Sequence, residues 1–179
     1  MKILGVGGTL RKGSYSKALL LEAQKLVPKE VVIEITETGD LPLYNPDIAL
    51  PEVVQKFKNS IKEADAILFS TAEYNYSIPG SLKNAIDWGS RPYGDNSWEE
   101  KPVAIMSESI GMLGGIRAQL HLRQAILFIN MLPLNRPEVI VSNAKEKFDE
   151  EGNLTDEHTK EKIKELLQAL AIWVERLKK

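Results

Sequence analysis

Two cations and three Ser or Thr hydroxyls gather in a short part of the stretch GVGGTLRKGSYSKALL, near the amino terminus. An apolar strand pattern precedes them, and apolar residues at helical spacing follow. Hydroxyls, a guanidinium and free backbone N–H groups at a helix start together favour an anion, above all a phosphate. We therefore interpret Thr9, Arg11, Ser14 and Ser16 as a candidate phosphate-binding loop. The alternative is an ordinary serine N-cap, with Arg11 and Lys12 in a solvated turn.

Two common nucleotide motifs fail at this loop. Gly8 and Gly13 have the Walker spacing, but the next two residues are Ser and Tyr, so the lysine for the β- and γ-phosphates is missing. Gly5 and Gly7 begin a dinucleotide pattern whose last glycine is replaced by Leu10, a side chain that obstructs close helix–strand packing. The loop is therefore better suited to a terminal monophosphate.

A second polar cluster follows the apolar run AILFST: Glu73, Tyr74, Asn75 and Tyr76. Turn chemistry explains the asparagine but not two tyrosines at an exposed edge. A flat heteroaromatic ligand would stack on the tyrosine rings, and backbone groups held in the turn would hydrogen-bond to the polar edge of the ligand. The alternative is that both tyrosines cap the core or form an oligomer contact.

A third loop, after the apolar run VAIMS, carries Ser107, Ser109 and Gly111. Glycines let backbone approach a ligand closely, so this loop could complete a ring site. A phosphate site and a ring site separated by the length of a short polyol describe flavin mononucleotide (FMN).

Strand and helix patterns alternate along the whole chain, which predicts a parallel α/β sheet covered on both faces. We expect one domain over residues 1–179, because no repeat or composition break divides the sequence. In such sheets ligands bind at the carboxyl ends of the strands, where all three loops open. The predicted strands are 2–7, 31–35, 66–71, 103–107 and one within 133–142; the predicted helices are 16–27, 53–61, 82–86, 115–130 and 163–177.

Composition excludes several function classes. A formal net charge of -2 gives no basic field for nucleic acid. The sequence has no cysteine, so we expect no disulfide, no thiolate metal site and no cysteine nucleophile. Its two histidines give no support for a poly-histidine metal site. No apolar run is long enough to span a bilayer. We expect a soluble, cytoplasmic protein without nucleic-acid, membrane or metal partners.

The segments TLRKGSYSKAL, AEYNYSIPGSLKNAIDW, GMLGGIRAQLHLRQ and PEV resemble those of the NAD(P)H-dependent FMN reductases, particularly the bacterial quinone, chromate and azo-dye reductase branch. The resemblance runs from residue 3 to about 141. It implies a flavodoxin-like three-layer sandwich with strand order 2-1-3-4-5, bound FMN, and NADPH or NADH as co-substrate. It also implies that the phosphate binds at residues 9–16, and that the isoalloxazine lies near residues 73–76 with a further contact at Ser109.

Three positions depart from the family pattern. Thr9 replaces the usual serine and preserves the hydroxyl, whereas Ala72 replaces the usual proline before Glu73. Leu120 stands where an aromatic residue is frequent.

The resemblance further implies an enzyme in which hydride passes from nicotinamide C4 to flavin N5 and then to a small-molecule acceptor. Quinones, chromate, azo dyes and nitro compounds are candidate acceptors, and one shared site predicts ping-pong kinetics. Because the cofactor supplies the chemistry, we expect no catalytic side chain. Two alternatives remain: a flavodoxin-type electron carrier without its own nicotinamide oxidation, and a phosphate binder without flavin.

The helix IRAQLHLRQAILFINML is more apolar than a one-sided surface helix requires, and NAIDWGSRP is expected to place Trp88 near the ring. We expect a homodimer or homotetramer with the site near a subunit boundary. The alternative is that this helix packs deep against the sheet.

Overall fold

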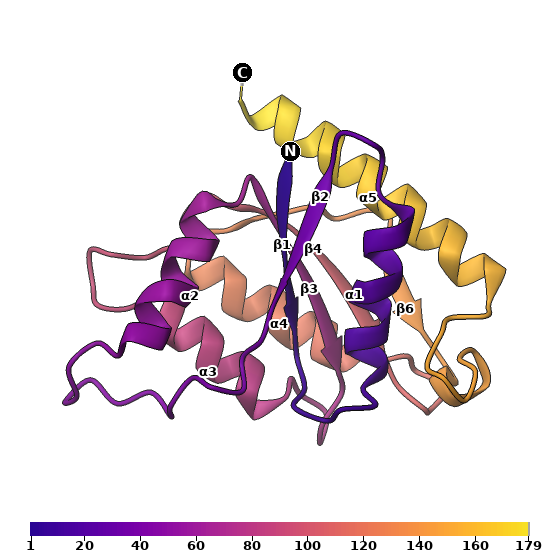
Figure 1. The fold of residues 1–179 in the computed structure, drawn as a ribbon, viewed down its shortest axis with the longest axis horizontal. Coiled ribbons are helices and arrows are strands. Elements are labelled where there is room, and N and C mark those ends of the chain that lie inside the picture. Colours follow the sequence, from indigo (N-terminus) through magenta and orange to yellow (C-terminus); the bar gives the residue numbers. More distant parts are fainter. Residues whose placement is uncertain (179) are drawn as a thin grey trace.

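The computed structural model describes residues 1–178, and residue 179 lies outside the described part. Its centre is a parallel sheet in the order β2-β1-β3-β4-β5 (Figure 1). This order and the parallel pairing confirm the expected architecture. The four longer strands are β1 (Lys2–Gly7), β2 (Val32–Thr36), β3 (Ala66–Ala72) and β4 (Pro102–Glu108).

The expected single strand within 133–142 is wrong in detail. Two short strands, β5 (Leu132–Pro133) and β6 (Val139–Val141), each pair in parallel with β4. Prolines stand at 133 and 137, and a proline has no N–H to donate to a ladder. The last strand is therefore split, and β6 is placed beside the carboxyl end of β4.

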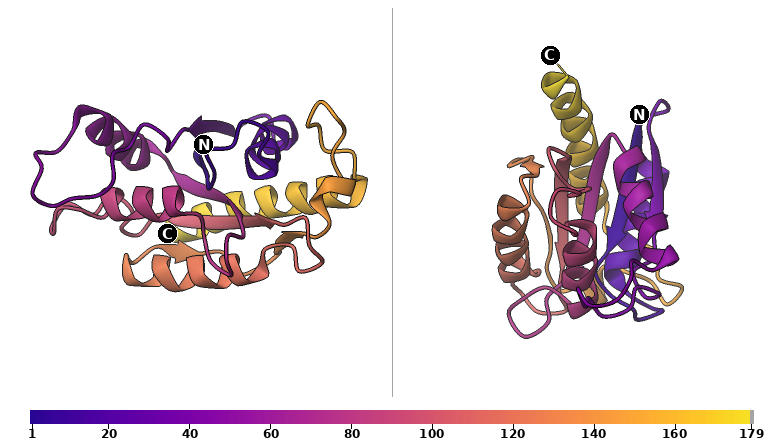
Figure 2. Two further views of the ribbon diagram at one scale, coloured as in Figure 1. Left: turned by 90° about the horizontal axis from the view of Figure 1, so that it is seen from below. Right: turned by 90° about the vertical axis from the view of Figure 1, so that its left-hand side faces the viewer.

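Helices cover both faces of the sheet (Figure 2), and each face has its own apolar core. The central strands β3 and β4 are buried at every position, as expected for strands between two helical layers. On one face lie α1 (Tyr15–Leu26) and α5 (Glu157–Leu177); on the other lie α2 (Glu52–Glu63), α3 (Gly80–Gly89) and α4 (Ile116–Phe128).

The connection from α3 to β4 is fixed by a buried Trp98. Its ring packs against Phe57 and Phe69, and its Nε1–H donates to the carbonyl of Ile86 at 3.1 Å. The ring leaves no room for a side chain at Gly89, where a Cβ would lie 2.2 Å from Trp98 Nε1. This close packing holds the end of α3 against the sheet.

The strands point toward one edge of the molecule, the lower edge in Figure 1, where the loops after β1, β3 and β4 meet. Both β2 and β3 lie next to β1, so successive strands are added first on one side of β1 and then on the other. Such a reversal opens a crevice between the diverging loops. Within residues 1–178, no helix has the length and apolar character needed to cross a bilayer.

Candidate functional site

Three hydroxyls form one hydrogen-bonded chain in the loop between β1 and α1. Thr9 Oγ1 donates to Ser14 Oγ at 2.5 Å, and Ser14 Oγ lies 2.7 Å from Ser16 Oγ. Ser14 is also the N-cap of α1, accepting from the backbone N–H of Lys17. The N-cap and the anion-loop interpretations are therefore compatible, because one serine serves both.

The start of α1 offers backbone N–H donors beside these hydroxyls. Within the described residues, no backbone carbonyl accepts from the N–H of Tyr15 or Ser16. Such N–H groups carry the partial positive charge of a helix N-terminus. The Arg11 guanidinium lies 5.4 Å from the centre of the Tyr15 ring and adds a full charge. The loop can therefore bind an anion through hydroxyls, amides and a guanidinium together.

The tyrosine-bearing loop is a tight β-hairpin. Tyr74 and Ser77 exchange two backbone hydrogen bonds of 2.9 Å, which leaves Asn75 and Tyr76 as the two turn residues. Both turn residues have positive φ, 48° and 67°, the sign that a type I′ turn requires. Tyr74 is 48% and Tyr76 66% exposed, which excludes the interpretation that they cap the core.

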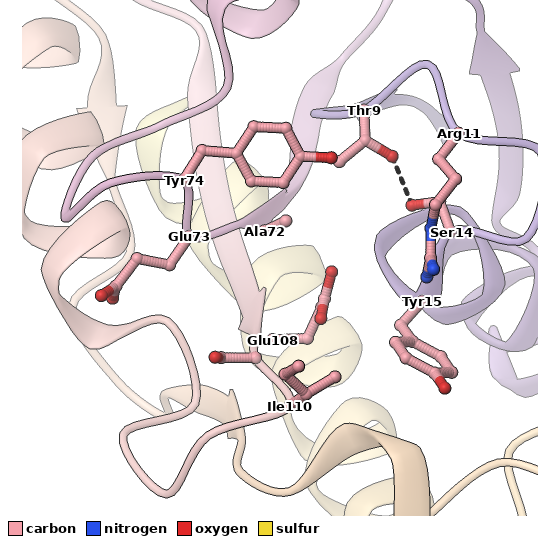
Figure 3. A pocket seen from close by; sticks show the side chains of 10 residues that line it. Thr9, Arg11, Ser14, Tyr15, Ala72, Glu73, Tyr74, Glu108 and Ile110 are labelled. Atoms are coloured by element: carbon pink, nitrogen blue, oxygen red, sulfur yellow. Dashed lines mark hydrogen bonds between the residues drawn. The ribbon is translucent and has the colours of Figure 1, made fainter.

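An ion pair supports this hairpin from α4. Nε of Arg117 lies 2.7 Å from Glu73 Oε1, and the backbone N–H of Arg117 donates to Oε2 at 3.2 Å. The same guanidinium lies 3.6 Å from the centre of the Tyr76 ring. His121, also on α4, is 3.1 Å from the hydroxyl of Ser77. The Glu73 carboxylate is thus committed to holding the turn, which is why it points away from Thr9 and Ser14 in Figure 3.

The glycine-rich loop after β4 depends on close backbone contacts. Gly114 and Gly115 have φ of +59° and +80°, and a Cβ on Gly115 would lie 2.8 Å from the carbonyl oxygen of Glu108. Ser107, expected at the ring site, is fully buried and donates to the Gly114 carbonyl at 2.9 Å. Ser109 Oγ accepts from a loop N–H. Ser107 therefore shapes the loop, and Ser109 faces the site.

The three loops enclose one cleft of about 260 Å³ (Figure 3). Six of the nine predicted site residues line it, while Ser16 is buried beside Ser14, and Asn75 and Tyr76 form the hairpin tip above. The lining residues are Thr9, Arg11, Ser14, Tyr15, Ala72, Glu73, Tyr74, Glu108, Ser109 and Ile110.

Sequence reasoning missed Glu108, the last residue of β4, which is only 5% exposed. Burial raises the pKa of Glu108 to about 7 from an ordinary 4.5, against the opposing effects of the Arg11 charge and the Ser16 backbone amide. A carboxylate directly after the apolar run VAIMS was the available signal. The apolar pattern ends the strand one residue earlier, at residue 107, so the sequence gives no sign that Glu108 belongs to a buried strand end.

The family model described as NADPH-dependent FMN reductase matches residues 1–146. The chain belongs to this family. It is 48% identical to an NAD(P)H-dependent FMN reductase of Pseudomonas aeruginosa, over 99% of this chain and 97% of that protein. It is also 42% identical to a quinone reductase of Pseudomonas putida, over 94% and 92% of the two chains.

The solved structure of FerB, a flavoenzyme NAD(P)H:acceptor oxidoreductase of Paracoccus denitrificans, is similar throughout. It covers 98% of this chain and 97% of its own, with a TM-score of 0.90 and 37% sequence identity. The expectation of an oxidoreductase of the FMN reductase family, with FMN as cofactor and NAD(P)H as co-substrate, is confirmed.

The donor set of this FMN reductase fits the cofactor's phosphate. Thr9 keeps the hydroxyl that the usual serine would supply, and it takes part in the hydroxyl chain. Ala72 lines the cleft where proline is usual. Trp88 departs from expectation: it is buried, it donates to the Pro42 carbonyl, and it packs edge-on against Tyr44, outside this cleft.

Proposed function

We propose that this FMN reductase oxidises NADPH or NADH and passes two electrons to a quinone or a related small acceptor, with chromate, azo and nitro compounds as further candidates. One observation carries the proposal: the phosphate loop, the tyrosine hairpin and the glycine loop open on the same cleft. A cleft that binds a phosphate at one side and a ring at the other suits FMN, the family's cofactor.

At the phosphate side, the Arg11 guanidinium supplies charge, and Thr9 and Ser14 supply hydroxyls directed at the same space (Figure 3). The Ser16 hydroxyl, 2.7 Å from Ser14 Oγ, helps to orient the Ser14 hydroxyl. Because these groups are already gathered, little conformational entropy is lost when the phosphate binds.

At the ring side, the hairpin presents Tyr74 and the backbone of Asn75 and Tyr76, and Ser109 faces it from the next strand. Bound FMN supplies hydride acceptance and donation. The chain's own residues therefore hold the ring edge rigidly and leave its outer face accessible. We assign no catalytic side chain. We infer that nicotinamide and acceptor use this open face in turn, which gives ping-pong kinetics.

We also propose that residues 1–179 act as one domain that assembles into a homodimer or homotetramer. The outer face of α4 supports assembly, because Leu120, Leu127 and Phe128 are 55%, 74% and 76% exposed. Apolar side chains gathered on one helix face usually meet a partner. Light scattering after gel filtration should give a multiple of 20.0 kDa. A monomer at micromolar concentration would contradict this.

The absence of cysteine leads us to propose a cytoplasmic location.

The deciding experiment combines FMN titration with steady-state kinetics. Flavin-free protein should quench FMN fluorescence at a stoichiometric end point, and the loaded protein should oxidise NADPH or NADH with benzoquinone as acceptor. Double-reciprocal plots at several quinone concentrations should be parallel. FMN binding without nicotinamide oxidation would indicate an electron carrier, and failure to bind FMN would leave a flavin-free phosphate binder. Comparing kcat/KM for the two nucleotides then gives the preferred donor.

A further inference from the structure

The cleft contains a carboxylate that the proposed binding of FMN does not use. Figure 3 shows the Glu108 side chain pointing into the cleft, on the side of Thr9 and Ser14. It is 95% buried by neighbouring residues, since only 5% of it is exposed. No cation lies within ion-pair distance of it among residues 1–178. A buried carboxylate therefore occupies the region where a phosphate would enter.

The charged groups around Glu108 leave little to neutralise it. From the loop after β1, Arg11 is the one cation among the described residues that line the cleft. From the loop after β3, Glu73 is already paired with Arg117 of α4. The other titratable lining groups are the phenol hydroxyls of Tyr15 and Tyr74. β6, which pairs with the end of β4, contributes only apolar residues.

The donors that favour ionised Glu108 are also those that a phosphate needs. Arg11 and the Ser16 backbone amide both act on the carboxyl group, and both belong to the phosphate loop. A phosphate monoester carries about -1.5 to -2 charges at pH 7. Two anions that share one desolvated site and one guanidinium repel each other, and the weaker acid takes up a proton. Ionised Glu108 is thus an internal competitor of the phosphate.

We propose that Glu108 couples FMN binding to the uptake of one proton, so that its carboxyl is neutral whenever the phosphate occupies the loop of residues 9–16. The proton comes from solvent and is released when FMN leaves. Affinity for FMN then falls as the pH rises above neutrality, and selectivity for FMN over riboflavin falls with it, since riboflavin has no phosphate. This inference rests on the proposed function and identifies one residue that sets the affinity for its cofactor.

The test measures FMN affinity of flavin-free protein by fluorescence quenching from pH 7 to pH 9, where the phosphate of free FMN, with a second pKa of about 6, is mainly dianionic. In the wild-type protein the dissociation constant should rise by up to about tenfold per pH unit, the slope that one linked proton gives. Glu108→Gln, which is isosteric and uncharged, should bind FMN with little pH dependence and at least tenfold more tightly at pH 8.5.

Calorimetry counts the proton directly. Titrations at pH 8 in two buffers of different ionisation enthalpy should show about one proton taken up per FMN by the wild type and about none by Glu108→Gln. A wild-type count of zero overturns the proposal even if the substitution disturbs folding, and a count of one is assigned to Glu108 by its loss in Glu108→Gln. Riboflavin is the matched ligand control, and its affinity for the wild type should stay constant over the same pH range.

Each contrary result has a definite meaning. FMN binding with no proton uptake, or with the same pH dependence for riboflavin, overturns the role of Glu108 and leaves the proposed function intact. No FMN binding by either protein at any pH overturns the proposed function and this inference with it.

Discussion

Arg117 Nε lies 2.7 Å from Oε1 of Glu73, although the two residues are separated by 44 positions in sequence. The pair joins the first turn of α4 to the hairpin that follows β3. Because Glu73 is nearly buried, its charge is poorly screened by water and its partner matters more than in a surface pair. The hairpin on the ring side of the cleft is therefore held in place by Arg117, a cation of α4 that does not itself line the cleft.

Glu73→Gln should weaken binding of FMN and riboflavin alike, by roughly three- to tenfold, because the ion pair is lost and the hairpin becomes less ordered. Fluorescence titration of both flavins measures this. Glu52→Gln removes a carboxylate of an exposed pair with Lys56 and should change neither affinity. A loss restricted to FMN would show that Glu73 acts at the phosphate instead.

Arg11→Ala should act on the phosphate alone. A hydrogen bond to a charged group contributes about 1.5–3 kcal/mol, so FMN affinity should fall roughly 10- to 100-fold. Riboflavin affinity should stay within about twofold, and thermal unfolding without flavin should be unchanged, since Arg11 is exposed. Equal losses for both flavins would contradict the assignment of Arg11 to the phosphate side.

The features that sequence predicted are those set by neighbouring residues. Hydroxyls and cations within one short loop indicated a candidate anion site, which stays a prediction, and the strand–helix alternation indicated which loops share an edge. The Asn75–Tyr76 turn was placed correctly for the same reason, although its positive φ values were not anticipated.

The features that sequence missed depend on contacts between distant segments. Arg117 has no local signal, because its partner is on another strand loop. In the sequence Glu108 is an ordinary carboxylate, and its pKa is raised only because the fold buries it next to the start of α1. Trp88 ends the segment AEYNYSIPGSLKNAIDW but packs outside the cleft, where the Pro42 carbonyl supplies an acceptor.

Gly89→Ala should destabilise the protein, because the new methyl group would lie 2.2 Å from Nε1 of fully buried Trp98. Overpacking of this kind costs about 1–3 kcal/mol, which lowers Tm by roughly 2–12 °C in a domain of this size. Gly80→Ala is the matched control at the other end of α3, where the Cβ would meet nothing within 4 Å. That variant should melt at or slightly above the wild-type temperature, and equal losses in both would refute the packing argument.

Glu108→Gln should stabilise the flavin-free protein at alkaline pH. With a pKa of about 7 in the folded state and an ordinary value of 4.5, Glu108 keeps its proton on folding where the unfolded chain has lost it. Unfolding therefore releases a proton between pH 4.5 and 7, and wild-type stability falls as the pH rises through this window. The uncharged glutamine avoids this loss, so the variant's advantage should grow from near zero at pH 4.5 to on the order of 3 kcal/mol at pH 8. Urea unfolding at pH 5 and pH 8 measures the difference, and an advantage of the same size at both would mean that glutamine merely packs better, without any titration of Glu108.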